Sequence, residues 1–108
     1  NRPWGSFINL DQGNGYKVKK LHILPGHKIS LQKHYKRSEH WVVITGTAFI
    51  TKGKKQFKLG ANQSTFIKKG EVHRIENKSK KDLIMIEVQT GEYLEEDDIK
   101  RFKDIYKR

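Results

Sequence analysis

Short segments with β-strand character recur about every ten residues along the chain, and turn-forming residues separate them. Tyr16–Leu24 stops at Pro25-Gly26, and the apolar segment His40–Thr45 stops at Gly46. The other segments are Ala48–Thr51, Gln56–Leu59, Ser64–Ile67, His73–Glu76 and Leu83–Gln89. A set of roughly seven or eight short strands is typical of a small β-sandwich or barrel, so the sequence predicts an all-β fold.

The C-terminal segment is the one part of the chain that indicates a helix. Ile99, Phe102, Ile105 and Tyr106 form an apolar stripe at helical spacing. The acidic run 95–98 stands where a helix N-terminus would favour carboxylates, and basic residues follow at the other end. We therefore expect a single domain over residues 1–108, with an N-terminal arm (1–15), a barrel (16–91) and a short C-terminal helix (95–108).

Composition limits the classes of function. The chain has no cysteine, which excludes disulfides, zinc–thiolate sites and thiol nucleophiles and fits the reducing cytoplasm where we expect the protein. No apolar run reaches the ~18 residues typical of a membrane span, so we expect a soluble protein without a membrane partner. The formal net charge is +11, but the 23 Lys and Arg residues are spread along the chain and not interleaved with stacking aromatic residues. This pattern favours small anionic ligands over nucleic acid, whose binding would depend steeply on salt.

Four polar residues in two strand regions are candidate metal ligands. Gln32 and His34 are two apart, so both can point to the same side of a strand. Glu39 shares its strand face with Trp41, so its carboxylate faces the core and needs a partner, for which a divalent cation is a simple choice. His73 follows a glycine turn at the start of another strand.

An amide oxygen, two imidazoles and a carboxylate suit zinc, manganese, iron, cobalt or nickel and leave room for a water or substrate oxygen. Taken alone, His34 or Gln32 would more often be a surface polar residue. His40 is adjacent to Glu39 and therefore on the opposite face, which excludes it from this site.

The spacing of these residues carries more information than their types. Gly26, Gln32, His34, Glu39 and Gly46 are spaced as in the first cupin motif, G-x5-H-x-H-x4-E-x6-G, with Gln32 in place of the first histidine. The second motif, G-x5-P-x-G-x2-H-x3-N, is matched at Gly70, His73 and Asn77 and is departed from at Asn62 and Lys68.

A longer likeness narrows the family. The matching residues are Arg2–Gly5, Tyr16–Lys19, Ser30–Gln32, His34, Arg37, Glu39–Val43, Gly46–Ala48, His73-Arg74, Glu76-Asn77, Glu87–Gln89, Gly91 and Glu96–Ile99. Together they resemble the type II mannose-6-phosphate isomerase domain from Arg2 to about Asp104. In that family the domain is commonly the C-terminal part of bifunctional mannose-1-phosphate guanylyltransferase/mannose-6-phosphate isomerases. The chain departs from the family at Lys36, where a histidine is frequent, at Lys68-Lys69 and at Glu95.

The resemblance implies a cupin jelly-roll barrel with one divalent metal ion, zinc first among zinc, cobalt, manganese, nickel and iron. Its ligands would be Gln32, His34, Glu39 and His73. It also implies interconversion of mannose 6-phosphate and fructose 6-phosphate for GDP-mannose and polysaccharide precursor synthesis. A fused or separate nucleotidyltransferase domain is the partner that this family would supply, and no glycine-rich nucleotide-binding loop occurs within these residues.

The isomerisation would move a proton between C2 and C1 through an enediol, and it needs a base, an electrophile and cations for the phosphate. Candidate catalytic residues are Arg37, Lys17, Glu76 and Glu87, and candidate phosphate-binding residues are Lys19 and Arg74. Arginine suits a phosphate or enediolate oxygen because its planar fork donates two parallel hydrogen bonds.

Three other readings stay open. The first is a non-catalytic sugar-phosphate-binding or dimerisation cupin, the second is another metal cupin such as an oxygenase or sugar-nucleotide isomerase, and the third is a nucleic-acid binder. Apolar residues also lie on both faces of some strands, such as Val42 and Ile44 opposite Trp41 and Val43. This pattern predicts that the outer sheet face is covered, either by a second copy in a homodimer or by the N-terminal segment or tail helix.

Overall fold

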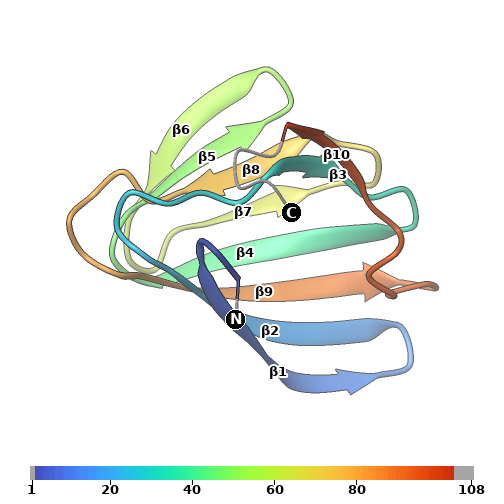
Figure 1. Cartoon of the computed structure of the whole chain (residues 1–108). Coiled ribbons are helices and arrows are strands. Elements are labelled where there is room, and N and C mark those ends of the chain that lie inside the picture. Colours follow the sequence, from blue (N-terminus) through green and yellow to red (C-terminus); the bar gives the residue numbers. More distant parts are fainter. Residues whose placement is uncertain (1, 104–108) are drawn as a thin grey trace.

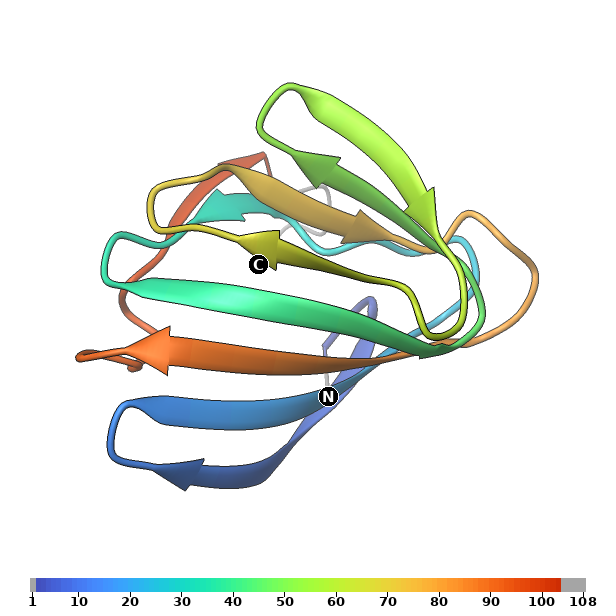
Figure 2. The ribbon, with the colours of Figure 1, turned by 180° about the vertical axis from the view of Figure 1, so that it is seen from behind.

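The computed structural model describes residues 2–103 as two five-stranded antiparallel sheets that face each other (Figure 1). The first sheet contains, in spatial order, β1 (Gly5–Gly13), β2 (Tyr16–Ile23), β9 (Leu83–Gly91), β4 (Arg37–Thr45) and β7 (Ser64–Ile67). The second contains β10 (Lys100–Lys103), β3 (Leu31–Lys33), β8 (His73–Glu76), β5 (Ala48–Lys52) and β6 (Lys55–Leu59). Figure 2 shows the same two layers from behind, with β1 and β6 at opposite outer edges. The predicted all-β fold is confirmed.

The predicted C-terminal helix is wrong for the described part of 95–108. Residues 95–98 form a turn closed by a hydrogen bond from the N–H of Asp98 to the carbonyl oxygen of Glu95 (3.3 Å). Lys100–Lys103 are strand β10, which pairs antiparallel with β3 through Lys100↔Lys33 and Arg101↔Gln32. The Asp98 carboxylate explains the difference, because its oxygens accept hydrogen bonds from two backbone N–H groups, those of Tyr35 (3.0 Å) and Lys36 (2.9 Å). This anchor brings the tail to the free edge of β3, where its backbone bonds to the sheet. The remainder of the predicted helix, residues 104–108, lies outside the described residues.

The predicted N-terminal arm is largely a sheet strand. Strand β1 pairs with β2 from Gly5↔Ile23 to Gly13↔Tyr16 and forms the edge of the first sheet.

Strand register divides the interior of the first sheet into an apolar half and a polar half. Leu21, Met85 and Val43 lie side by side across β2, β9 and β4, within the hydrophobic core. The next row on the same inner face lies two residues away on each strand. It consists of Lys19, Glu87 and Trp41. The next row is Lys17, Gln89 and Glu39. The polar residues are therefore held at one end of an otherwise apolar interior.

The outer face of the first sheet carries exposed apolar side chains. Ile8, Ile44 and Phe66 have 56%, 48% and 41% of their surface exposed. In residues 2–103 neither of the segments expected to cover this face does so, since β1 is an edge strand and residues 95–103 contain no helix. The homodimer stays a prediction. Within the same described residues, the structure contains no helix of the length and apolarity needed to cross a bilayer.

Candidate metal centre

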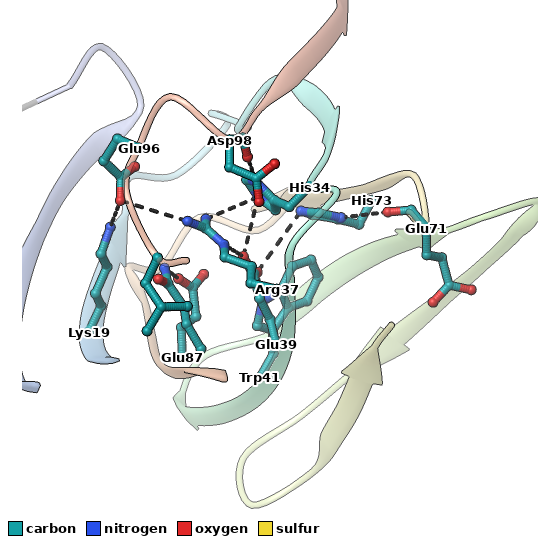
Figure 3. A network of polar contacts seen from close by, with 12 residues as sticks. Lys19, His34, Arg37, Glu39, Trp41, Glu71, His73, Glu87, Glu96 and Asp98 are labelled. Atoms are coloured by element: carbon teal, nitrogen blue, oxygen red, sulfur yellow. Dashed lines mark hydrogen bonds and ion pairs between the residues drawn. The ribbon is translucent and has the colours of Figure 1, made fainter. Parts of the chain in front are cut away.

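Three of the predicted ligands converge at the polar end of the interior (Figure 3). One ligand atom each of His34, Glu39 and His73 lies within 4.8 Å of the other two. The three side chains are 4%, 2% and 2% exposed, respectively. They come from different places in the fold: Glu39 from β4 in the first sheet, His73 from the start of β8 in the second, and His34 from the residue after β3.

Gln32 lies beside this triad. It is the residue of β3 that pairs directly with His73 of β8, so the two side chains share a strand face. Gln32 also lines the same small cavity as His34 and Glu39, which has a volume of about 30 Å³. A cavity of this size has room for an ion or a water molecule. All four predicted ligands therefore border one small cavity.

Both histidines present a lone pair to the carboxylate of Glu39. Nδ1–H of His34 donates to the carbonyl oxygen of Asp98 (2.6 Å), and Nδ1–H of His73 donates to that of Glu71 (2.9 Å). A carbonyl oxygen only accepts, so each Nδ1 carries the hydrogen and each Nε2 is left with its lone pair. These Nε2 atoms lie 3.2 and 4.0 Å from the nearer oxygens of Glu39.

Burial also keeps these imidazoles neutral. Desolvation, with the Arg37 charge second, lowers the pKa of His34 to about 4. The pKa of His73 is likewise lowered, mainly by burial. A neutral lone pair facing a carboxylate is unfavourable without a cation between them. The Nε2 of His73 has no hydrogen-bond partner among the residues that the structure describes, and it is buried. The donor set and this orphaned nitrogen fit a divalent metal ion, and the backbone carbonyls that orient both imidazoles are usual around metal-ligating histidines.

Arg37 supplies part of the missing positive charge. Its Nε donates to one oxygen of Glu39 (2.9 Å), and its Nη2 donates to the Nε2 of His34 (3.0 Å). The other oxygen of Glu39 accepts a hydrogen bond from the indole Nε1 of Trp41 (2.9 Å). A metal ion held by His34 and Glu39 would need the lone pair that Nη2 now uses. Arg37 and the ion therefore compete for this nitrogen.

Glu87 is the buried acid next to the cavity. Burial, followed by the charge of Glu39, raises the pKa of Glu87 to about 7. Gln89 Nε2 donates a hydrogen bond to its carboxylate, and Lys19 pairs with Glu87 in the β2–β9 register. A carboxyl group that is close to half ionised at neutral pH can both accept and release a proton.

The remaining catalytic and phosphate-binding candidates from the sequence differ in whether they reach the cavity. The Nζ of Lys17 donates to the carbonyl oxygen of Leu94 (3.0 Å), away from the cavity walls. His73 and Ile75 face inward on β8, so Glu76 projects from the other face of that strand and lines neither the small cavity nor the larger cavity beside it. Arg74 reaches the wall of the small cavity, but its Nε is held by the carbonyl oxygen of Ile29 (3.2 Å). His40 is exposed, and its ring packs at a tilt against that of Phe66 with 4.6 Å between the ring centroids, as expected for an outer-face residue.

A larger cavity of about 80 Å³ adjoins the first and shares Gln32, His34, Arg37 and Glu87 with it. Four further charged residues line it, and they come from both ends of the described chain as well as from β2: Arg2, Lys19, Glu96 and Arg101. Sequence reasoning selected only Lys19 among these. The acidic run 95–98 is the sequence signal that could have pointed to Glu96 and Asp98. The helical spacing of the apolar residues after it favoured a helix N-terminus instead.

Comparison with known proteins gives the family. A family model described as mannose-6-phosphate isomerase C-terminal matches residues 1–104. The chain is 49% identical over 107 residues to xanthan biosynthesis protein XanB of Xanthomonas campestris pv. campestris, covering 99% of the chain and 23% of XanB. It is 47% identical over 107 residues to mannose-1-phosphate guanylyltransferase ManC of Salmonella typhimurium, covering 99% of the chain and 22% of ManC. The chain thus spans between a fifth and a quarter of the length of these curated relatives.

Solved structures agree on the fold. A conserved protein of Klebsiella pneumoniae subsp. pneumoniae with a double-stranded β-helix domain superposes with a TM-score of 0.82 at 21% identity, over 96% of this chain and 89% of that one. This likeness confirms the predicted cupin double-stranded β-helix. Because the family model spans almost the entire sequence, the chain belongs to the mannose-6-phosphate isomerase C-terminal family.

Proposed function

We propose that this chain is a metal-dependent aldose–ketose isomerase that interconverts mannose 6-phosphate and fructose 6-phosphate. The observation that carries the proposal is the convergence of His34, Glu39 and His73 on one buried point, with a raised-pKa carboxyl group, Glu87, on the same cavity wall. XanB and ManC are named for xanthan biosynthesis and for mannose-1-phosphate guanylyl transfer. By extension, we assign this chain to the supply of GDP-mannose and polysaccharide precursors, with a nucleotidyltransferase domain as fused or separate partner and the cytoplasm as its location.

His34, Glu39 and His73 would hold the metal ion, with Gln32 as the fourth ligand. When bound, a zinc, cobalt, manganese, nickel or iron ion would act as a Lewis acid toward the oxygens on C1 and C2 of the sugar. The backbone carbonyls of Asp98 and Glu71 fix the ring orientation of the two histidines, so that Nε2 of each is the ligand atom.

Glu87 is the general base in this proposal. As a carboxylate it takes the proton from C2 of open-chain mannose 6-phosphate, and as a carboxylic acid it returns that proton to C1. The hydroxyl proton passes from O2 to O1 in the same conversion, which leaves the ketone at C2. A pKa of about 7 suits both directions, because neither protonation state is strongly favoured at neutral pH. The buried positive charge of Arg37, next to the same cavity, would favour the negatively charged enediolate electrostatically, without a hydrogen bond to its oxygen.

The test combines metal content with turnover. Purified chain is analysed for metal, assayed in a coupled mannose-6-phosphate isomerase reaction, stripped with a chelator and assayed again with single metals restored. His34→Ala and Glu39→Ala should lose both bound metal and activity, whereas the matched His40→Ala, on the outer face of the same sheet, should keep both. Full turnover by metal-free protein would reject the proposal.

One observation favours a second candidate, a sugar-phosphate-binding module without metal chemistry. Arg37 already neutralises Glu39 and occupies the lone pair of His34, so two of the ligands are satisfied by protein alone. Binding of mannose 6-phosphate without turnover, in protein that takes up no metal, would select this candidate.

A further inference from the structure

The segment that leads into β10 places a carboxylate on two buried cations. The Glu96 carboxylate accepts a hydrogen bond from Nζ of Lys19 (2.7 Å) and lies 3.9 Å from Nη1 of Arg37 (Figure 3). The side chains of Lys19 and Arg37 are 6% and 5% exposed, whereas that of Glu96 is 54% exposed. The cations are therefore fixed in the interior, and the anion that meets them stands at the edge of the solvent.

The partners of Arg37 leave one of its donors unused. Nε and Nη2 bond to Glu39 and His34, but the buried Nη1 has no hydrogen-bond partner among the described residues. The distance from Nη1 to Glu96 is too long for a hydrogen bond, so this contact is a charge interaction only. The cavity wall thus presents a buried N–H donor to whatever lies at the position of Glu96.

Two more cations border the same cavity. The guanidinium carbon of Arg2 lies 5.2 Å from the centre of the Phe7 ring, and Nζ of Lys19 lies 4.3 Å from the same centre, so both charges are held over one ring. Arg101 of β10 lines the cavity from the opposite sheet. In the part of the chain that the structure describes, neither Arg2 nor Arg101 forms an ion pair with a carboxylate. Among residues 2–103, four basic side chains therefore surround this cavity, against two acidic ones, Glu87 and Glu96.

We propose that Glu96 is a displaceable gate, and that the phosphate group of the substrate binds where its carboxylate now lies, against Lys19 and Arg37 with Arg2 and Arg101 at the rim. The identity of the anion as a hexose phosphate rests on the proposed function. A phosphate carries up to two negative charges and three acceptor oxygens, so it can satisfy Nη1 of Arg37 and Lys19 together, which the carboxylate does not. The half-exposed Glu96 loses little on turning toward water.

The backbone around Glu96 need not move for this exchange. Asp98 is buried and anchored to the backbone N–H groups of Tyr35 and Lys36, so the segment stays in place while the Glu96 side chain rotates out. A neutral sugar has no charge with which to compete for Lys19. The gate therefore selects phosphorylated over unphosphorylated hexose.

The test measures binding of inorganic phosphate, mannose 6-phosphate and mannose by calorimetry to the full chain and to three variants. Glu96→Gln keeps the size of the side chain but removes the competing charge, so it should bind both phosphates about two- to tenfold more tightly. Glu95→Gln is the matched control, because it makes the same change in net charge at an exposed neighbour that does not line this cavity. It should bind like the unaltered chain. Lys19→Met should weaken both phosphates by about tenfold or more, with mannose unaffected in every variant.

Equal phosphate affinities in the unaltered chain, Glu96→Gln and Glu95→Gln would overturn the gate, as would failure of inorganic phosphate to bind to Glu96→Gln at millimolar concentration. The two proposals fail separately. Tighter phosphate binding by Glu96→Gln in a protein without isomerase turnover would reject the proposed function and retain the gate. If both variants turn over mannose 6-phosphate and Glu96→Gln has the same KM for it as Glu95→Gln, the gate is rejected and the function is retained.

Discussion

The Glu87 carboxyl group ionises less readily in the folded chain than in the unfolded chain. This difference between the two states is measurable as a dependence of stability on pH. Its side chain lies in the interior, and burial, with the charge of Glu39 second, raises its pKa from the ordinary 4.5 to about 7. Because the folded state holds this proton more tightly than the unfolded state does, its stabilising contribution is complete below pH 4.5. That contribution is lost as the pH rises through about 7.

The size of the effect follows from the two pKa values. Integrating the proton linkage between pH 5 and pH 8, with values of 4.5 and about 7, gives a loss of about 2–3 kcal/mol in the free energy of unfolding. A domain of this size has a total stability of about 5–15 kcal/mol, so the loss is a large fraction of the whole. Glu87→Gln removes the ionisable group while its amide oxygen still accepts the hydrogen bond from Gln89.

The assay is urea unfolding of metal-free protein in chelator at pH 5, 6, 7 and 8, followed by the fluorescence of the two buried tryptophans, Trp4 and Trp41. Burial lowers the pKa values of His34 and His73, so these groups act in the opposite direction and cost stability as the pH falls below about 6.5. Both proteins contain these histidines. The difference between the unaltered chain and Glu87→Gln therefore reports mainly on the carboxyl group, with a smaller part from the effect of its charge on the two histidines.

We expect that difference to move by about 2–3 kcal/mol in favour of Glu87→Gln between pH 5 and pH 8. A difference that is constant within about 0.5 kcal/mol over the range, roughly the error of such measurements, would refute the reasoning. It would mean that Glu87 ionises in the folded chain as readily as in the unfolded one, and the main argument for Glu87 as a base that works near neutrality would go with it.

Three further predictions follow from the site and the turns around it. Glu87→Gln should lower the kcat of the coupled isomerase reaction by about 100-fold or more with metal content unchanged, whereas Glu76→Gln should retain normal turnover; equal losses would contradict the assignment. Asp98→Ala should free the segment whose carbonyl orients His34 and weaken metal binding by about 10- to 100-fold in a competition with a chelating dye, and unchanged affinity would count against that role. Gly46→Ala should destabilise the fold by about 1–3 kcal/mol in urea, because φ is +95° and a Cβ would lie 2.6 Å from a backbone carbonyl oxygen; a smaller cost would show that the turn relaxes.

The convergence of the candidate metal ligands could be anticipated because the strand face of each residue is set locally. A separation of two residues between Gln32 and His34, and the apolar neighbours of Glu39 in β4, fix the strand faces without knowledge of the rest of the fold. The same parity excludes His40. It could also have excluded Glu76, which is three residues from His73 on β8 and therefore on the opposite face.

The environment of Glu87 and the course of the tail depend on contacts between distant segments. Glu87 is next to Lys19 and Trp41 only because β2, β9 and β4 pair in one register, and that register decides its burial. The tail residues Ile99 and Phe102 have a helical period over too few turns to distinguish a helix from a short strand. Asp98 decides the outcome by bonding to backbone more than 60 residues earlier in the sequence.

Arg37 connects the candidate metal centre to the proposed anion site. Its Nε and Nη2 contact Glu39 and His34 on one side, and its Nη1 faces Glu96 on the other. A carboxylate as buried as Glu39 requires a positive charge at all times, because an unpaired charge in the interior costs several kcal/mol, by a rough estimate. If a metal ion takes that role, the guanidinium is repelled by the ion and attracted by an anion at the position of Glu96. In this proposal the same buried carboxylate accounts both for the affinity for a cation and for the availability of Arg37 to the substrate.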